Sequence, residues 1–293
     1  MSKDRTVGRN VFLYNGKTGE ALGGLEQQGS FTEANLLWVL EKILLVCDAP
    51  FVVVNRDTDK QVKQKDRPLV PGYYGVFCDG TMTLTDEPWL PRISCYSVSG
   101  LDNNFRDSVR ARDGRCVVSG IVNELAPRGR WDSFEVGHVF PLEWESVWTD
   151  EKYGRWIKGN DSVESIAQMN SPQNGILLTS NLRRWFDQYL FSINPDDDYK
   201  VTVFCKDIFK IDGKKLDKVC RQNEDPNRVS KEILRWHFRQ AVLANMRGVG
   251  EPTFETDFPP GSDRLSAMRD GPYGKERLEK TLDIRMKWAS LNR

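Results

Sequence analysis

The stretch Phe134-Glu-Val-Gly-His138-Val-Phe-Pro141 decides the fold of this 293-residue chain, because it places one of only two histidines in a β-like segment. Pro141 ends that segment, since proline cannot donate to a strand ladder. A second apolar segment, Asn174-Gly-Ile-Leu-Leu, begins 36 residues after His138. A helix-like segment that contains Arg183-Arg-Trp-Phe-Asp187 follows it. This order predicts a strand, a strand and a helix around His138.

The residue types in these segments suit hydrolysis of a phosphodiester. His138 is a candidate general base, because the unperturbed pKa of histidine lies near neutrality. Such a base must be aimed by a partner on its other ring nitrogen. Arg183 and Asp187 stand four residues apart, so both face the same way on a helix. The motif therefore predicts a polar site where this helix meets the two strands.

The same order resembles the HNH nucleases, which are also called ββα-metal or His-Me finger nucleases, and it is most similar to the fungal HNH-domain proteins. The likeness covers most of the chain, and it is carried by an ordered set of short motifs. These are Arg112-Asp-Gly-Arg-Cys-Val-Val-Ser-Gly120, Glu135-Val-Gly-His138-Val-Phe-Pro, Asn174-Gly-Ile-Leu-Leu, Leu182 to Asp187 before Phe191-Ser-Ile, Leu234-Arg-Trp-His-Phe, Gly250-Glu-Pro-Thr-Phe-Glu255 and Asp257-Phe-Pro-Pro-Gly.

The resemblance implies an α+β fold class, with a ββα-metal (HNH-like) core, an N-terminal α+β module and C-terminal helices. It also implies roles for the motif residues. His138 would be the general base and Asn174 would orient it. The helix would supply metal ligands at nine and thirteen residues beyond Asn174, which are Arg183 and Asp187. Asp187 and His138 are therefore the candidate metal ligands, and His138, Asn174 and Arg183 the candidate catalytic residues.

Two positions depart from the family pattern. Gly137 stands where many HNH enzymes have a histidine or aspartate ligand, and Arg183 stands where a helix histidine is expected. One carboxylate and one histidine could recruit Mg²⁺ or another divalent metal weakly, since Mg²⁺ keeps several waters. Zinc is harder to support, because it prefers several nitrogen or sulfur ligands. Arg183 could instead bind phosphate bidentately, or it could pair with Asp187 and close the site.

The pattern of apolar residues and breakers predicts three regions. Residues 1–98 are expected to form an N-terminal α+β module, residues 99–210 the HNH-like core, and residues 211–293 a helical extension packed on the core. The predicted elements are strands at 10–15, 51–55, 75–78, 82–84, 92–98, 191–193 and 200–205, a strand pair at 116–122, and helices at 31–47, 103–115, 161–169, 229–247 and 274–290.

Composition restricts the partners. The formal net charge is zero, which excludes a globally basic protein that coats nucleic acid. DNA contact is expected only through local basic patches, since arginines outnumber acids six to three between residues 106 and 130. The six cysteines are scattered without a CxxC pair, which favours reduced thiols. We expect an intracellular protein, cytoplasmic or nuclear, without a signal peptide or membrane span. Its oligomeric state stays open.

Two classes of function compete. The first is an endonuclease that hydrolyses phosphodiesters with His138 as the general base. The second is a repurposed or inactive HNH scaffold, either a metal-independent enzyme that acts on a small molecule through His138 and Arg183, or a binding module. A third hypothesis is that residues 1–98 form a surface that recruits a protein partner.

Overall fold

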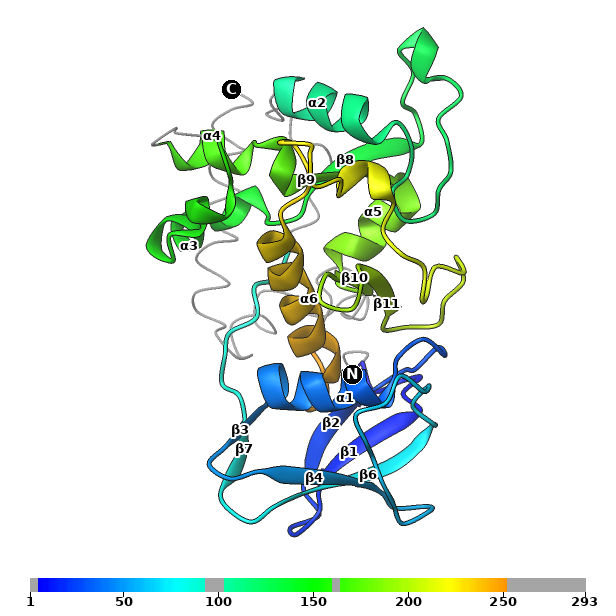
Figure 1. Cartoon of the computed structure of the whole chain (residues 1–293), viewed down its shortest axis with the longest axis vertical. Helices are drawn as coiled ribbons and strands as arrows, with labels where there is room; N and C mark the ends of the chain where they lie inside the picture. The colour runs from blue at the N-terminus through cyan, green and yellow to red at the C-terminus, as the bar shows by residue number, and fades with distance from the viewer. Residues whose placement is uncertain (1–4, 93–102, 160–163, 252–293) are drawn as a thin grey trace, which may run out of the picture.

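The computed structural model describes residues 5–92, 103–159 and 164–251. These residues form a mixed α+β structure with a five-stranded sheet at one end, the His138 hairpin at the other, and the long helix α6 between them (Figure 1). Two predicted elements, a strand at 92–98 and a helix at 274–290, lie wholly or almost wholly outside the described residues.

The first end of the molecule is a sheet with the strand order β2-β1-β6-β4-β5. The pairing of β1 with β6 is parallel, and the other pairings are antiparallel. Two short strands, β3 and β7, form a separate antiparallel pair. The strands are β1 (Val11–Asn15), β2 (Ala21–Leu25), β3 (Leu45–Cys47), β4 (Phe51–Asn55), β5 (Lys60–Gln61), β6 (Gly72–Cys78) and β7 (Met82–Leu84).

One helix of this end is shorter than the apolar spacing predicts. α1 (Glu33–Val39) begins where Thr32 accepts a hydrogen bond from the backbone N–H of Asn35, and the side chain of Asn35 accepts one in return. It continues as a π-helical turn, η1 (Leu40–Leu44), and then becomes strand β3. The predicted helix over 31–47 is therefore wrong at its end, because pairing with β7 makes residues 45–47 extended.

The second end contains the antiparallel hairpin of β8 (Phe134–His138) and β9 (Gly175–Thr179). Its register pairs His138 with Gly175, so the histidine lies where β8 ends and β9 begins. Helix α5 (Ser180–Asp187) follows β9 directly, and the hairpin of β10 (Phe191–Asn194) and β11 (Lys200–Val203) follows α5. The remaining helices here are α2 (Asn103–Asp113), α3 (Glu145–Asp150) and α4 (Ser165–Met169). Residues 116–122, predicted as a strand pair, keep only an isolated bridge between Arg115 and Val122.

Two hydrophobic clusters stabilise the two ends, and α6 (Lys231–Met246) belongs to both. Its first half, including Ile233 and Leu234, packs among the residues around the β8–β9 hairpin. Its second half, including Phe238 and Val242, packs against α1 and the five-stranded sheet. Ser230 caps the helix by accepting a hydrogen bond from the N–H of Ile233. Burial along its whole length makes α6 the shared core element of the fold.

Two further features concern the cysteines and the helices of the described residues. The five cysteines among them are all free thiols. Across residues 5–92, 103–159 and 164–251, no helix combines the length and the apolar character needed to cross a bilayer.

Candidate active site

His138 is held on two sides at the end of β8. Its side chain is only 6% exposed. The imidazole stacks on the ring of Phe105 from α2, with the centroids 4.1 Å apart and the planes 9° from parallel. Its Nε2 lies 3.0 Å from the amide oxygen of Asn170, the residue that caps the end of α4. With that oxygen facing it, Nε2 carries the ring proton, and Nδ1 keeps the lone pair that a general base needs.

The surroundings of His138 keep it neutral. Burial lowers its pKa most, and the positive charges of Arg183 and Arg92 lower it further, while the hydrogen bond to Asn170 acts in the opposite direction. The resulting pKa of His138 is about 3. The imidazole is therefore unprotonated at physiological pH, which is the state in which it can accept a proton.

Asn174 makes its side-chain hydrogen bonds to the backbone of Phe140 and Met169. It is fully buried. Its Nδ2 donates to the carbonyl oxygens of Phe140, at 3.0 Å, and Met169, at 2.9 Å. Its Oδ1 accepts from the N–H of Phe140 at 2.7 Å. Asn174 therefore fixes the backbone next to His138, whereas the ring itself is hydrogen-bonded by Asn170, a residue that sequence reasoning missed.

Arg183 lies where the family pattern expects a metal ligand. Its guanidinium packs so closely on Gly137 of β8 that a Cβ at position 137 would overlap its Nε. Its Nη1 donates to Oδ1 of Asp187, one turn further along α5. Burial and the charge of Arg92 lower the pKa of Arg183 to about 9, so it stays charged at neutral pH. The absence of a side chain at Gly137 and the long side chain of Arg183 therefore complement each other.

A second arginine completes the network from outside the motif. Arg92 is 2% exposed, and its Nε lies 3.1 Å from the same Asp187 oxygen. Its Nη1 donates to the carbonyl oxygen of Val139 at 2.6 Å, and its Nη2 donates to that of His138. Arg92 thus ties α5 to His138 and Val139, the residues on either side of the end of β8. No sequence motif marks this arginine, because its partners lie far away along the chain.

A divalent metal does not fit this arrangement. The carboxylate of Asp187 is shared between two guanidinium groups, because Arg92 and Arg183 both contact its Oδ1. The positive charges of Arg183 and Arg92 act on His138 itself. In the part of the chain that the structure describes, no three His, Cys, Asp or Glu side chains are grouped as metal ligands would be. The predicted ligand pair, His138 and Asp187, therefore has two positive charges where a cation would have to sit.

Other residues that the sequence singles out have structural partners. The side chain of Arg112 is buried, and it donates to Asp113 and to the carbonyl oxygens of Pro172, Gly175 and Asn227. His237 is fully buried, with Nδ1 at 2.7 Å from Ser192 and Nε2 at 3.2 Å from the carbonyl of Phe186.

The tryptophans near the motif serve packing in the same way. Trp148 is buried, and Trp144 donates to the carbonyl oxygen of Pro91 at 2.8 Å. Trp156 stacks on Tyr153 with centroids 4.0 Å apart, and Trp131 lies under the guanidinium of Arg110. A cavity of about 710 Å³ occurs elsewhere, beside β3 and β4 of the first end, and it is lined by residues such as Leu37, Val46 and Phe51. The rings and this cavity therefore add no group to the site at His138.

Two segments of the chain match known protein families. Residues 116–194 match the family described as HNH endonuclease, and residues 8–83 match a family described as a domain of unknown function (DUF8573). No curated protein and no solved structure matches the chain. The HNH match includes His138, Asn170, Asn174, Arg183 and Asp187, whereas Arg92 lies before it. The chain thus carries an HNH-family segment, which supports a nuclease-like function in general.

Proposed function

We propose that this protein is an HNH-type phosphodiesterase that acts on nucleic acid without a divalent metal. The observation that carries the proposal is the guanidinium of Arg183, which lies on Gly137 beside the neutral His138. A guanidinium offers a fixed positive charge and paired N–H donors to a phosphate, which is the electrostatic help that a metal ion would otherwise supply. The HNH match of residues 116–194 supports phosphodiesters as the substrate class.

In the proposed reaction, Nδ1 of His138 takes a proton from an attacking hydroxyl or water. The attacking oxygen forms a bond to phosphorus as the bond to the leaving oxygen breaks, and the leaving oxygen takes up a proton from solvent. Arg183 neutralises the charge that grows on the non-bridging oxygens. Asn170 keeps the proton on Nε2, and Asn174 keeps the backbone after His138 in place.

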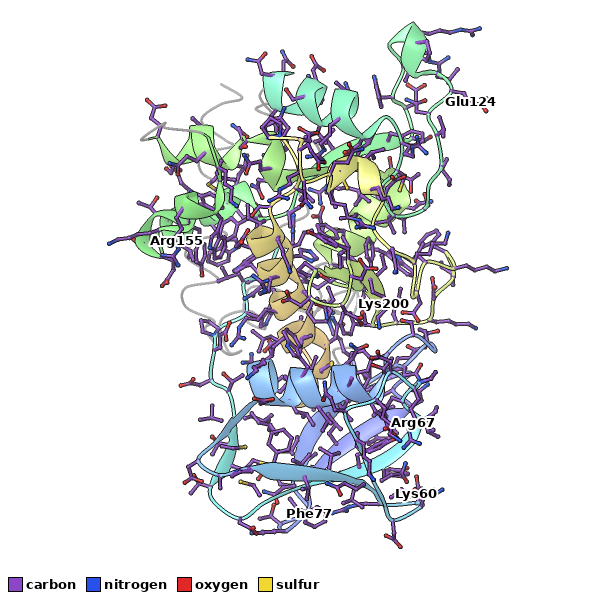
Figure 2. The ribbon with its side chains drawn as sticks, in the orientation of Figure 1. Lys60, Arg67, Phe77, Glu124, Arg155 and Lys200 are labelled. Carbon is purple, nitrogen blue, oxygen red and sulfur yellow. The ribbon has the colours of Figure 1, made fainter. Side chains whose placement is uncertain are left out.

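Nucleic acid would approach along an arginine-bearing loop. The loop between α2 and β8 projects from the body of the protein, with Glu124 on its outer part (Figures 1 and 2). Arg128 and Arg130 are exposed on this loop, although Arg130 pairs with Asp132 at 2.6 Å. Exposed arginines can follow a phosphate backbone, and such contacts weaken as salt rises. These exposed arginines would give a protein of zero net charge a local basic surface for binding nucleic acid.

Cleavage assays in excess EDTA test the proposal. The full chain is incubated with end-labelled single-stranded and duplex DNA and with RNA, either in EDTA or with Mg²⁺, Mn²⁺ or Zn²⁺. We expect cleavage of at least one substrate in EDTA, at a rate that added metal does not raise. Cleavage that requires an added metal would overturn the metal-free mechanism, and failure to cleave any substrate under all conditions would reject the enzyme.

The second candidate is an HNH scaffold that binds nucleic acid without cleaving it. The ion pair between Arg183 and Asp187, together with the small exposed fraction of His138, favours this alternative because both restrict access to the imidazole. Fluorescence anisotropy with the same oligonucleotides separates the two candidates. Salt-dependent binding with intact substrate after long incubation is the result that this second candidate predicts.

A further inference from the structure

The two arginines of the site share one carboxylate in direct contact, and the negative charges of Glu135 and Glu143 also act on Arg183. Two guanidinium groups, from Arg92 and Arg183, meet one carboxylate, from Asp187. Arg92 is almost completely buried, and its two terminal nitrogens are satisfied by the carbonyl oxygens of His138 and Val139. It is therefore fixed in place. Arg183 differs, because Asp187 is the hydrogen-bond acceptor for its side chain among the described residues.

Arg183 is also the arginine that reaches solvent. Its side chain is 18% exposed and that of Asp187 is 15% exposed, compared with 2% for Arg92. A pair of residues at the i and i+4 positions of a helix can separate by a change of side-chain rotamer, without movement of the backbone. An incoming anion could therefore replace the Asp187 carboxylate on Arg183, while Arg92 continues to hold Asp187 through its Nε.

We propose that Arg183 is a phosphate-binding residue and that Asp187 is an internal anion that occupies it until substrate binds. This inference rests on the proposed function, because it assigns the substrate phosphate to one side chain of that site. A phosphate group carries more negative charge than a carboxylate and presents more acceptor oxygens, so it competes well for a guanidinium. Asp187 thus limits the affinity of the site for phosphate. The family pattern implies the opposite role, in which this residue would help to bind phosphate by holding a metal ion.

The two roles of Asp187 predict opposite results for Asp187→Asn. A metal ligand that loses its charge weakens substrate binding and catalysis. An internal competitor that loses its charge releases Arg183, so phosphate binds more tightly. Asparagine keeps a side chain of the same size, with an amide oxygen beside the Nε of Arg92. We expect the Kd for a short oligonucleotide in EDTA to fall about fivefold, equal to about 1 kcal/mol at 25 °C.

A matched control separates this effect from the general change in net charge. Asp79→Asn removes one carboxylate from another ion pair, Lys17–Asp79, which is exposed and lies at the five-stranded-sheet end, outside the site and the arginine-bearing loop. Its effect on the Kd should be small and should vanish at high salt. Arg183→Gln should weaken oligonucleotide binding in both the wild-type and the Asp187→Asn background. Thermal unfolding of each variant confirms that the protein used in the binding assay is folded.

The outcomes distinguish this inference from the proposed function. Tighter binding by Asp187→Asn than by Asp79→Asn supports the internal competitor, even if no variant cleaves nucleic acid. Equal binding by the two variants overturns it, even if the wild type cleaves in EDTA. Titration with inorganic phosphate, followed through the NMR signal of the Arg183 side chain, provides a second readout. A shift that appears at lower phosphate concentration in Asp187→Asn supports the inference, and unchanged titration overturns it.

Discussion

His138→Gln is expected to lower kcat/KM for phosphodiester cleavage by on the order of 10³-fold, within the usual range for a general base. Glutamine can still hydrogen-bond Asn170, but it cannot accept a proton from the attacking group. Because His138 is neutral and stacked on Phe105, the substitution removes no charge from the folded protein. Steady-state cleavage in EDTA measures the effect, and thermal unfolding checks the fold. An activity that stays within a few-fold of wild type would remove His138 from the mechanism.

The pH dependence of the wild type offers a check on the same residue. Activity requires unprotonated His138, so activity is lost as pH falls through its pKa. Burial lowers that pKa to about 3. The acid limb of kcat/KM, which reports the free enzyme, is therefore expected well below pH 6. A bound phosphate raises the pKa of a nearby imidazole, so the acid limb of kcat should lie at higher pH. An acid limb of kcat/KM near 6.5 would contradict the buried environment of His138.

Asn174→Ala is expected to lower the free energy of unfolding by about 4 kcal/mol, because it leaves one N–H and two carbonyl oxygens without their buried partner. Those groups belong to Phe140, which follows β8, and to Met169, the last residue of α4. Urea unfolding of wild type and variant measures the change. The stability loss should be accompanied by reduced cleavage, since the backbone beside His138 loses its support.

Asn10→Ala is the matched control for this change. Asn10 is half-buried and makes two hydrogen bonds to the backbone of Gln27, at 2.9 and 2.8 Å, next to the ends of β1 and β2. Its substitution should cost about 1 kcal/mol, since water can replace the lost partner. It should also leave cleavage unchanged. If Asn174→Ala costs no more than Asn10→Ala, the buried bracing role of Asn174 is wrong.

The sequence predicts the local part of the site better than its long-range part. The spacing of four between Arg183 and Asp187 indicates a contact on one helix face, and the two side chains are paired. The apolar segments around His138 and Asn174 indicate two strands, and β8 and β9 pair there, with Asn174 immediately before β9. These features follow from strand and helix periodicity, which is a property of neighbouring residues.

Arg92 and Asn170 could not be found in the same way. Arg92 contacts residues 46, 47 and 95 positions further along the chain, so only the packed fold brings them together. Asn170 lies directly after the predicted helix at 161–169 and belongs to none of the family motifs, and its contact with His138 depends on where α4 packs. A similar long-range contact explains residues 45–47, where pairing with β7 overrides a helical pattern.

Anomalous scattering from crystals grown in Mn²⁺ tests most directly whether Arg183 has taken the place of a metal. We expect no anomalous peak between His138 and Asp187, with the Arg183 guanidinium on Gly137 and paired with Asp187. A peak within coordination distance of both His138 and Asp187, with Arg183 turned away from Gly137, would contradict the metal-free site.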